Sequence, residues 1–460
     1  MPEKKHFHFV GVCGTAMGSV AAAMMRKGFT VTGSDANVYP PMSDFLRDEG
    51  VEVVEGYRGS NIPEGADAIV IGNAISRGND EAEEALDRRL LYVSLPEVMK
   101  EYFLRGKRNL VVAGTHGKTT TSSLLAWLLL SAGRDPGWMI GGLPRNLGRG
   151  AHFPDSEFNV LEGDEYDTAF FDKRSKFLHY LPEVAVINNI EFDHADIYDN
   201  LDQIKLSFER LLRVVPRNGL AVVNGDDPNC LDVAGGAPCP VTKVGFGSNC
   251  DVRIESVEYT PGGSAFDLGA TRFSVAMPGE FNVRNAAMAA TAARHAGLSD
   301  EEIREGLASF QGIARRQELR GVAGGVKVID DFAHHPTAIR QAVEALRQQH
   351  PEGRLWVLFE PRSNTTKRKI FQNELAECLA GADVAVIAAL PDPEKVPPED
   401  RLDPAAVAAN VPGGKGRYIP GVEAIVEAVA AETVAGDVVA VLSNGGFGGI
   451  HQLLLEALAD

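Results

Sequence analysis

The chain has 460 residues, a formal net charge of −18 at pH 7 and a pI near 5.1. This acidity argues against nucleic acid or an anionic membrane as the main partner, although local clusters of Arg and Lys can still bind a small anion. The length favours about three domains, each large enough to bury its own core. Five cysteines without CxxC spacing indicate neither a disulfide framework nor a zinc site. The N-terminus leads directly into a strand with no signal segment, so a cytoplasmic location is expected.

The first section reads as a strand, a glycine loop, a helix and a second strand, which is the start of a Rossmann-like βαβ fold. These elements fall at residues 7–10, 11–18, 21–25 and 30–35. Asp35 ends the second strand, where its carboxylate could bond a ribose. The glycine spacing is not GxGxxG, so the loop predicts the fold but does not by itself indicate a dinucleotide. Further strands at 68–72 and 91–94 precede a charged connector at 105–108.

The second section opens on the most informative motif of the chain. A strand at 110–113 is followed by Gly-Thr-His-Gly-Lys-Thr-Thr-Thr at 114–121 and by the start of a helix. Backbone N–H groups at such a turn cradle phosphate oxygens, while the lysine and a hydroxyl supply a countercharge and a Mg²⁺ ligand. The common P-loop has a glycine at the position of Val112, so the glycines here lie closer together. A plain strand-to-helix turn is the alternative, but a lysine followed by three threonines favours binding of a nucleoside triphosphate.

Buried strands alternate with helical stretches through the rest of the chain, which implies parallel sheets covered on both faces. The strands fall at 159–161, 184–187, 220–223, 327–331, 355–359, 384–387 and 438–442. Residues 252–277, with a turn at 261–263, read as antiparallel strands, and an alanine-rich helix follows at 285–296. We therefore predict an α/β fold of three domains. They are a Rossmann-like domain (1–107), a P-loop ATPase-like domain with a mostly parallel sheet (108–312) and a second Rossmann-like domain (313–460).

Two polar segments follow predicted strands of the second section. Residues 162–165 contain three acids, and residues 188–196 combine asparagines, acids and His194. Ligands of α/β sheets bind at the carboxyl ends of the strands, and Mg²⁺ prefers hard oxygen ligands. The alternatives are a solvated acidic turn and a histidine satisfied within the core. Beside a phosphate loop, we interpret Glu162 as a Mg²⁺ ligand and His194 as part of a second metal site.

Three segments of the third section also follow strands. Residues 330–336 form an Asp-His cluster that is poor core material. The loop at 360–369 is basic within an acidic chain, and it reads equally as a solvated helix start or as a receptor for carboxylates. The glycine loop at 443–451 either binds an anion or turns the chain tightly.

Together, residues 114–120, 188–194 and 331–336 resemble the corresponding motifs of the Mur ligases, over essentially the full length of the chain. The loop at 11–18 is similar to the UDP-N-acetylmuramate-binding loop of the alanine-adding member. Segments at 33–42, 164–176, 360–365 and 443–447 are closer still to the member that attaches a tripeptide to UDP-N-acetylmuramate in peptidoglycan recycling. Such long strings are more specific than any single loop.

The resemblance implies ATP-dependent amide synthesis through an acyl phosphate, with ATP and Mg²⁺ as cofactors. The substrates would be UDP-N-acetylmuramate and the murein tripeptide L-Ala-γ-D-Glu-meso-diaminopimelate. The alanine-adding ligase of de novo synthesis is the nearest alternative, and a non-catalytic nucleotide-binding regulator and a dinucleotide oxidoreductase are alternatives of other classes. No nucleic-acid or membrane partner is expected, and the chain is predicted to be a monomer or a weak homodimer.

The resemblance also implies roles for individual residues. Lys118, His194 and His334 would be catalytic, and Thr119, Glu162 and His194 would hold metal. The residues expected to bind ATP are Gly114, Thr115, His116, Gly117, Lys118, Thr119, Thr120, Asn282, Asn285, Arg316 and Asp331. Those expected to bind the UDP-sugar are Gly11, Cys13, Gly14, Thr15, Ala16, Met17, Ser34, Asp35 and Asn73. Those expected to bind the peptide are Arg362, Ser363, Asn364 and Lys367. Some Mur ligases use a carbamylated lysine, and whether Lys205 is one stays open.

Overall fold

The computed structural model describes residues 4–195, 197–260 and 262–459. These residues form three large sheets that follow one another along the chain, with helices between the strands. The predicted α/β class with mostly parallel sheets is confirmed. Asp196 of the predicted polar segment and Pro261 of the predicted turn lie outside the described residues, as does the start of the chain.

The first sheet has five parallel strands in the order β3-β2-β1-β4-β5. Its strands are β1 (His6–Val10), β2 (Thr30–Asp35), β3 (Glu52–Glu55), β4 (Ala68–Ile71) and β5 (Tyr92–Ser94). Its helices are α1 (Thr15–Arg26), α2 (Met42–Asp48), α3 (Asp80–Asp87) and α4 (Leu95–Met99). The strand order reverses at β1, so the glycine loop after β1 lies at the switch point where such sheets bind ligands.

The second sheet has ten strands in the order β17-β16-β15-β14-β13-β12-β6-β9-β7-β8. The strands are β6 (Arg108–Ala113), β7 (Gly137–Met139), β8 (Ala151–His152), β9 (Phe158–Gly163), β12 (Pro182–Ile187), β13 (Leu220–Asn224), β14 (Val241–Gly245), β15 (Val252–Thr260), β16 (Gly263–Leu268) and β17 (Thr271–Val275). The pairs β7–β8, β15–β16 and β16–β17 are antiparallel, which confirms the predicted antiparallel segment near its C-terminal end. A separate hairpin joins β10 (Asp167–Ala169) to β11 (Asp172–Ser175).

Helices cover both faces of the second sheet because its strand residues alternate between two apolar cores. Val111 and Ala113 of β6 face one core, which includes apolar residues of α6 (Leu201–Arg213) and α7 (Pro228–Ala234). Leu110 and Val112 face the other core, with α5 (Lys118–Ser131), α8 (Glu280–His295) and α9 (Asp300–Ala308). Burial on both faces explains why residues 110–113 of β6 form a continuous apolar run.

The third sheet has six strands in the order β18-β19-β23-β20-β21-β22, of which only the β18–β19 pair is antiparallel among the described residues. The strands are β18 (Glu318–Ala323), β19 (Val326–Asp331), β20 (Leu355–Phe359), β21 (Val384–Ile387), β22 (Gly416–Tyr418) and β23 (Val438–Leu442). Its helices are α10 (Pro336–Gln349), α11 (Gln372–Glu377), α12 (Pro404–Asn410), α13 (Val422–Glu432) and α14 (Ile450–Ala457). Residues of α10 to α12 share one core with the sheet, and residues of α13 and α14 share the other.

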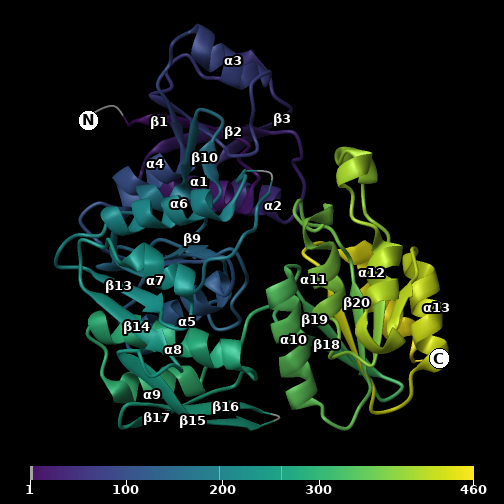
Figure 1. Cartoon of the computed structure of the whole chain (residues 1–460). Coiled ribbons are helices and arrows are strands. Elements are labelled where there is room, and N and C mark those ends of the chain that lie inside the picture. The colour runs from purple at the N-terminus through teal and green to yellow at the C-terminus, as the bar shows by residue number, and fades with distance from the viewer. Residues whose placement is uncertain (1–3, 196, 261, 460) are drawn as a thin grey trace.

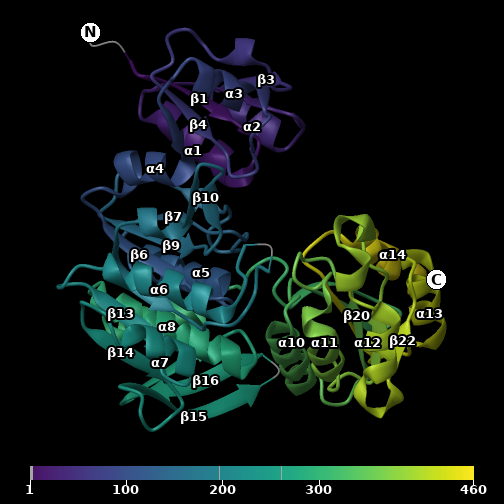
Figure 2. The same cartoon turned by 45° about the horizontal axis from the view of Figure 1, so that its top comes forward.

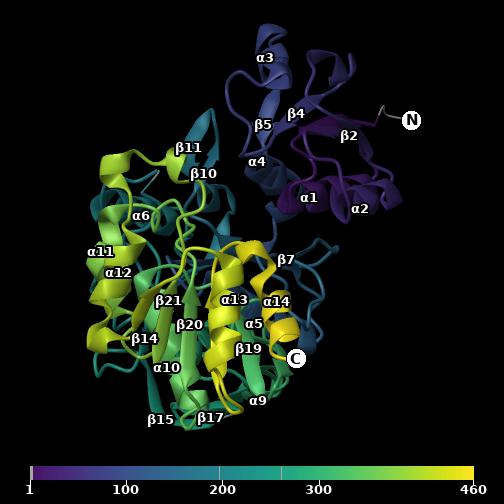
Figure 3. The ribbon, with the colours of Figure 1, turned by 90° about the vertical axis from the view of Figure 1, so that its right-hand side faces the viewer.

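The three sheets form three lobes (Figure 1). The purple first lobe lies above the teal second lobe, and the green-to-yellow third lobe lies beside the second. The turned views in Figures 2 and 3 keep the second lobe next to each of the others. Helix α1 packs against β8, and α10 packs against α8 and β15. Within the described part of the chain, every helix is too short or too polar to cross a bilayer.

Candidate active site

The phosphate loop joins β6 to α5, and its shape depends on a glycine. Gly117 has φ +77, and an added Cβ there would lie 2.6 Å from Asn285 Oδ1 and 2.9 Å from Asn188 Nδ2. The loop is fixed by Asn189, whose carbonyl accepts the Thr115 N–H at 3.1 Å and whose Oδ1 accepts the His116 N–H at 2.7 Å. A side chain at position 117 would clash, so the turn requires glycine there. With this turn, the predicted residues 114–120 lie at the N-terminus of α5, which is a favourable place for an anion.

Lys118 lies in a chain of buried charges. Its Nζ donates to Glu165 Oε2 at 2.7 Å, and His194 Nε2 lies 2.9 Å from Glu165 Oε1. Burial alone would raise the pKa of Glu165, but the positive charges of Lys118 and His194 lower it to about 2. Burial works against the charged forms of Lys118 and His194 too, yet the carboxylate raises the pKa of both. Two of the three predicted catalytic residues, Lys118 and His194, are therefore linked through one ionised glutamate.

The sequence interpretation did not assign a role to Glu165. It lies three residues beyond Glu162 in the same acidic segment, which was recognised as a whole. The contact with Lys118 spans 47 residues and the contact with His194 spans 29, so no local pattern distinguishes Glu165 from Asp164. The sequence does show that Glu165 follows the strand at 159–161, and this position was the only available indication that it could belong to the site.

The predicted metal ligands Thr119 and Glu162 contact one another. The Thr119 hydroxyl donates to Glu162 Oε1 at 2.9 Å, and the Gly141 N–H donates to Oε2 at 2.7 Å. Burial raises the pKa of Glu162, so its ionised form gains from a neighbouring cation. A hydroxyl beside a buried carboxylate is a donor set that suits Mg²⁺, and Glu165 with His194 offers a second set on the other side of Lys118.

We expect Glu162→Gln to raise the Mg²⁺ concentration needed for half-maximal activity by at least ~10-fold, because a neutral amide is a weaker ligand than a carboxylate. The measurement is ADP release during a Mg²⁺ titration at saturating substrates. Asp167→Asn is the matched control, since Asp167 loses a charge in the adjacent hairpin, where it pairs with the exposed Lys173. An unchanged titration of Glu162→Gln would mean that Glu162 belongs to an ordinary acidic turn.

Residues from the third sheet reach the phosphate loop across the lobe boundary. Arg316 donates to the Thr119 hydroxyl at 3.4 Å, and its guanidinium lies over the Phe332 ring at 4.8 Å from the centroid. Asp331 accepts the Gln317 N–H at 2.8 Å and the Ala333 N–H at 2.7 Å. The structure thus brings the predicted Arg316 to the predicted Thr119, while Asp331, the last residue of β19, is held by the backbone of Gln317 and Ala333.

His334 follows β19 on the same edge. Its Nδ1 lies 3.0 Å from the Phe332 carbonyl, which can only accept, so Nδ1 carries the ring proton and Nε2 presents a lone pair. Burial lowers the pKa of His334, which keeps the imidazole neutral. A second contact joins the lobes nearby, where the Thr365 hydroxyl donates to Asp193 Oδ1 at 2.7 Å.

A small pocket of about 30 Å³ lies beside the phosphate loop. It is lined by His116, Gly117, Asn188, Asn189, Phe281, Arg284, Asn285 and Gln341. The predicted Asn285 lines it, and Asn285 Nδ2 and Asn188 Oδ1 are buried without a hydrogen-bond partner among the described residues. The predicted Asn282 instead donates to the Pro278 carbonyl at 2.7 Å. Gln341 comes from α10 in the third lobe, so only the assembled fold reveals it.

The predicted UDP-sugar residues gather at the carboxyl edge of the first sheet. Asp35 accepts the Cys13 N–H at 2.9 Å and the Asn37 N–H at 3.1 Å, which ties the glycine loop 11–18 to the end of β2. Gly14, Thr15 and Asn73 are exposed there, Gly11, Cys13 and Ala16 are half-buried, and Met17 is buried. The Ser34 side chain is fully buried and donates to Glu81 at 2.5 Å, so a ligand could use only its backbone.

The predicted peptide residues lie in the loop after β20. Arg362 is 44% exposed, with one guanidinium nitrogen 3.5 Å from Glu360 Oε1, and an added Cβ on Gly445 would lie 2.3 Å from its Cδ. Gly445 therefore makes room for the arginine side chain. Ser363 and Thr366 share a hydrogen bond at 2.8 Å, Lys367 is buried, and Asn364 is exposed. Lys205 lies elsewhere, on α6, where it pairs with Asp232.

Comparison with known proteins matches all three lobes. Three family descriptions match in turn: Mur ligase family, catalytic domain (6–106), Mur ligase middle domain (112–293) and Mur ligase, glutamate ligase domain (315–445). The chain is 41% identical over 98% of each sequence to UDP-N-acetylmuramate–L-alanyl-γ-D-glutamyl-meso-2,6-diaminoheptandioate ligase of Escherichia coli K12. A solved murein peptide ligase from Psychrobacter arcticus superposes with a TM-score of 0.72 at 36% identity over 99% of each chain. UDP-N-acetylmuramate–L-alanine ligase of Clostridium botulinum is 32% identical over 84% of this chain and 83% of its own.

Three α/β lobes with a phosphate loop, together with the matches to named ligases, identify an ATP-dependent ligase that forms a C–N bond. The chain belongs to the Mur ligase family.

Proposed function

We propose that the chain joins L-Ala-γ-D-Glu-meso-diaminopimelate to UDP-N-acetylmuramate at the expense of ATP, as in peptidoglycan recycling. The observation that carries this proposal is the relative from E. coli, whose name states this tripeptide reaction and whose match extends over 98% of both chains. The L-alanine ligase from C. botulinum is less similar, at 32% identity over 84% of this chain. The tripeptide reaction is therefore preferred over the L-alanine reaction.

The reaction follows from the chemistry of a carboxylate, which is a poor acylating agent until it gains a leaving group. The muramate carboxylate attacks the γ-phosphorus of ATP, which gives an acyl phosphate and ADP. The amine of the tripeptide then attacks the acyl carbon, and inorganic phosphate leaves from the tetrahedral intermediate. The Lys118 ammonium neutralises the transferred phosphoryl group. The neutral imidazole of His334, with its lone pair at Nε2, is suited to take the proton released by the amine.

The three lobes divide the substrates between them in this proposal. The proposed domains end at residues 107, 312 and 460. The first would bind the UDP-sugar, the second ATP and the third the peptide. Thr119 and Glu162 would hold one Mg²⁺, and Glu165 with His194 a second, and the ions would neutralise phosphate charge. Arg316 and Asp331 would contact ATP from the third domain. The small pocket lined by Asn285 would bind the adenine base of ATP.

We further propose that the chain works in the cytoplasm as a monomer or weak homodimer. The five cysteines, all within the described residues, are free, and free thiols suit a reducing compartment. The supply of ATP in the cytoplasm is consistent with this assignment.

The assignment is tested by following ADP release with ATP, Mg²⁺, UDP-N-acetylmuramate and either the tripeptide or L-alanine. We expect the tripeptide to support turnover with a much higher kcat/KM than L-alanine. Omitting UDP-N-acetylmuramate is the control, because ADP release should then fall to background with either amine. If L-alanine is used as well as the tripeptide, the L-alanine ligase reading replaces this one.

A further inference from the structure

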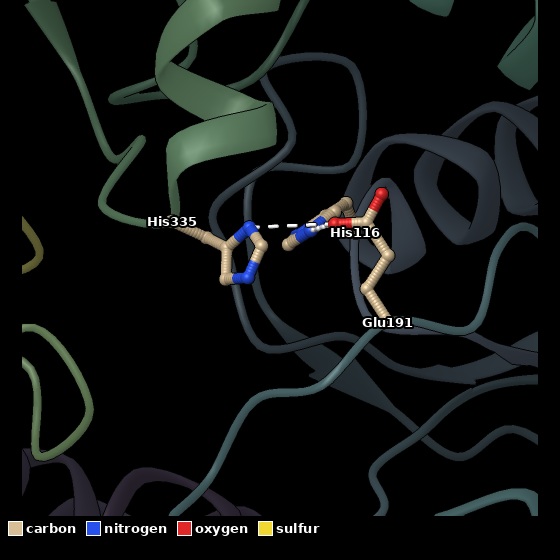
Figure 4. Close-up of side chains that lie close together, drawn as sticks. All are labelled: His116, Glu191 and His335. Atoms are coloured by element: carbon tan, nitrogen blue, oxygen red, sulfur yellow. Dashed lines mark hydrogen bonds and ion pairs between the residues drawn. The ribbon is translucent and has the colours of Figure 1, made fainter. Parts of the chain in front are cut away.

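Two histidines and a glutamate from distant parts of the chain converge beside the phosphate loop (Figure 4). His116 belongs to the loop, Glu191 follows β12, and His335 immediately precedes α10 in the third lobe. One nitrogen or oxygen atom from each side chain lies within 4.8 Å of the other two. Glu191 and His335 have no role in the proposed ligase reaction, and His116 is expected to bind ATP only as part of the phosphate loop.

The protons on the His335 ring can be placed from its neighbours. Its Nε2 lies 3.2 Å from the Phe192 carbonyl, which can only accept, so Nε2 carries the proton. Its Nδ1 accepts the Thr337 N–H at 3.3 Å and lies 3.4 Å from Glu191 Oε2. Nδ1 has a single lone pair, so a metal bound to it would replace the long hydrogen bond from the Thr337 N–H. Glu191 Oε2, which also accepts the Thr337 hydroxyl at 2.7 Å, would be the carboxylate ligand shared with that metal.

Two of the three distances between the ligand atoms suit a small tetrahedral ion, and the third pair of atoms lies within 4.8 Å. A metal with bonds of about 2.0–2.1 Å holds neighbouring ligand atoms about 3.3 Å apart. Glu191 Oε2 lies 3.1 Å from His116 Nε2 and 3.4 Å from His335 Nδ1, and the two imidazole centroids are 4.5 Å apart. Bonding to the metal moves the His116 proton from Nε2 to Nδ1 without net proton release. Glu191 is 33% exposed, which leaves a route from solvent and room for a water ligand.

We propose that His116, Glu191 and His335 form a binding site for a divalent transition metal ion of the zinc class. Two imidazole nitrogens and one carboxylate favour such an ion over Mg²⁺, which prefers oxygen ligands. The Phe192 carbonyl is the outer-shell acceptor that orients His335, as in other histidine–metal sites. The site is separate from the Mg²⁺ positions proposed at Thr119–Glu162 and Glu165–His194.

A metal at this site would join the phosphate loop directly to the third lobe. His116 and Glu191 belong to the second lobe and His335 to the third, so one ion bridges the boundary that ATP is proposed to span. Substrate entry and product release need that boundary to loosen. We therefore expect the bound metal to inhibit turnover even when Mg²⁺ is saturating.

The probe is Co²⁺, whose visible absorption reports its coordination, titrated into the full chain with excess Mg²⁺ and no nucleotide. We expect one equivalent to bind, and His335→Asn to raise the Kd by at least ~100-fold, above the ~10–100-fold typical for loss of an outer-shell partner. Asparagine is chosen because it keeps the helix cap that His335 provides to Thr337. His350→Asn is the matched control, since His350 caps the other end of the same helix.

Thermal unfolding establishes that each variant is folded, and Glu191→Gln takes the place of His335→Asn if the latter is not. Tight Co²⁺ binding by the folded ligand variants, or its loss in His194→Gln instead, would overturn the proposal. A second readout is ADP release, in which Zn²⁺ should inhibit the parent more strongly than His335→Asn. The Co²⁺ titration uses no substrate, so it stands or fails independently of the ligase assignment.

Discussion

Replacing Lys118 with alanine should lower kcat by at least ~100-fold, the scale for loss of one preorganised group that stabilises a transition state. The ammonium lies at the N-terminus of α5 and is held there by Glu165 at 2.7 Å. No other cation in that chain of contacts can take its place, because His194 bonds the far oxygen of the same carboxylate. The measurement is ADP release with saturating ATP, UDP-N-acetylmuramate and tripeptide.

The variant also leaves Glu165 without one of its two cationic partners. Removing one partner of a buried ion pair costs about 3–5 kcal/mol when nothing compensates. Here His194 still contacts Glu165, so the loss of stability should be smaller and the variant should fold, which thermal unfolding checks. Lys205→Ala is the matched control, since Lys205 is a half-buried lysine that pairs with one aspartate. A kcat of Lys118→Ala within a few-fold of the parent would contradict the phosphate-loop assignment. A large loss of kcat in Lys205→Ala would instead indicate that Lys205 is a carbamylated lysine of the active site.

Replacing Arg362 with alanine should raise the KM for tripeptide by about 30- to 150-fold, equivalent to the ~2–3 kcal/mol of a charged hydrogen bond. The tripeptide carries three carboxylates, whereas L-alanine carries one, so its site needs additional cations. Arg362 lies at the carboxyl end of β20 and is 44% exposed, and Glu360 contacts one of its nitrogens at 3.5 Å. The rest of the guanidinium fork is placed to bind a carboxylate. Initial rates at varied tripeptide, with ATP and UDP-N-acetylmuramate saturating, give the KM.

Arg417→Ala is the matched control for Arg362→Ala. Arg417 is 41% exposed and also pairs with a glutamate, so its removal changes the net charge equally. We expect Arg417→Ala to leave the KM for tripeptide unchanged, and the KM values for ATP and UDP-N-acetylmuramate to move little in either variant. Equal KM values for Arg362→Ala and the parent would place the distal carboxylates elsewhere.

Much of the fold could be predicted from the sequence because the long strands are buried on both faces. Residues 110–113 of β6 and all of β20 and β23 are uninterrupted apolar segments, and the sequence predicts each of them as a strand. The short strands β7 and β8, of three and two residues, were missed. A strand of that length shows no periodicity, and it forms because a neighbouring strand edge offers hydrogen bonds. The hairpin of β10 and β11 was missed for the same reason.

Some residues of the candidate site could also be predicted from the sequence, whereas others could not. Lys118 and Thr119 are adjacent in a local motif, and Glu162 directly follows the strand predicted at 159–161, so each could be singled out from the sequence, although β9 extends through Glu162 to Gly163. His116, Glu191 and His335 are separated by 75 and 144 residues, and no local pattern indicates that they meet. Gln341 lies on the phosphate-loop pocket only because α10 packs against α8. Contacts across the lobe boundary depend on tertiary packing and could not be read from spacing.

The contact between Glu165 and Lys118 has a consequence for how ATP enters. Glu165 acts as a resident counter-ion, which keeps a buried ammonium protonated before any nucleotide arrives. In the proposed function, an incoming triphosphate would exchange one anionic partner of Lys118 for another, so the ammonium would never be buried without a counter-ion. The released carboxylate would stay beside His194, where it could bind a metal ion that arrives with the nucleotide. The proposal thus couples nucleotide binding and metal binding through the single side chain of Glu165.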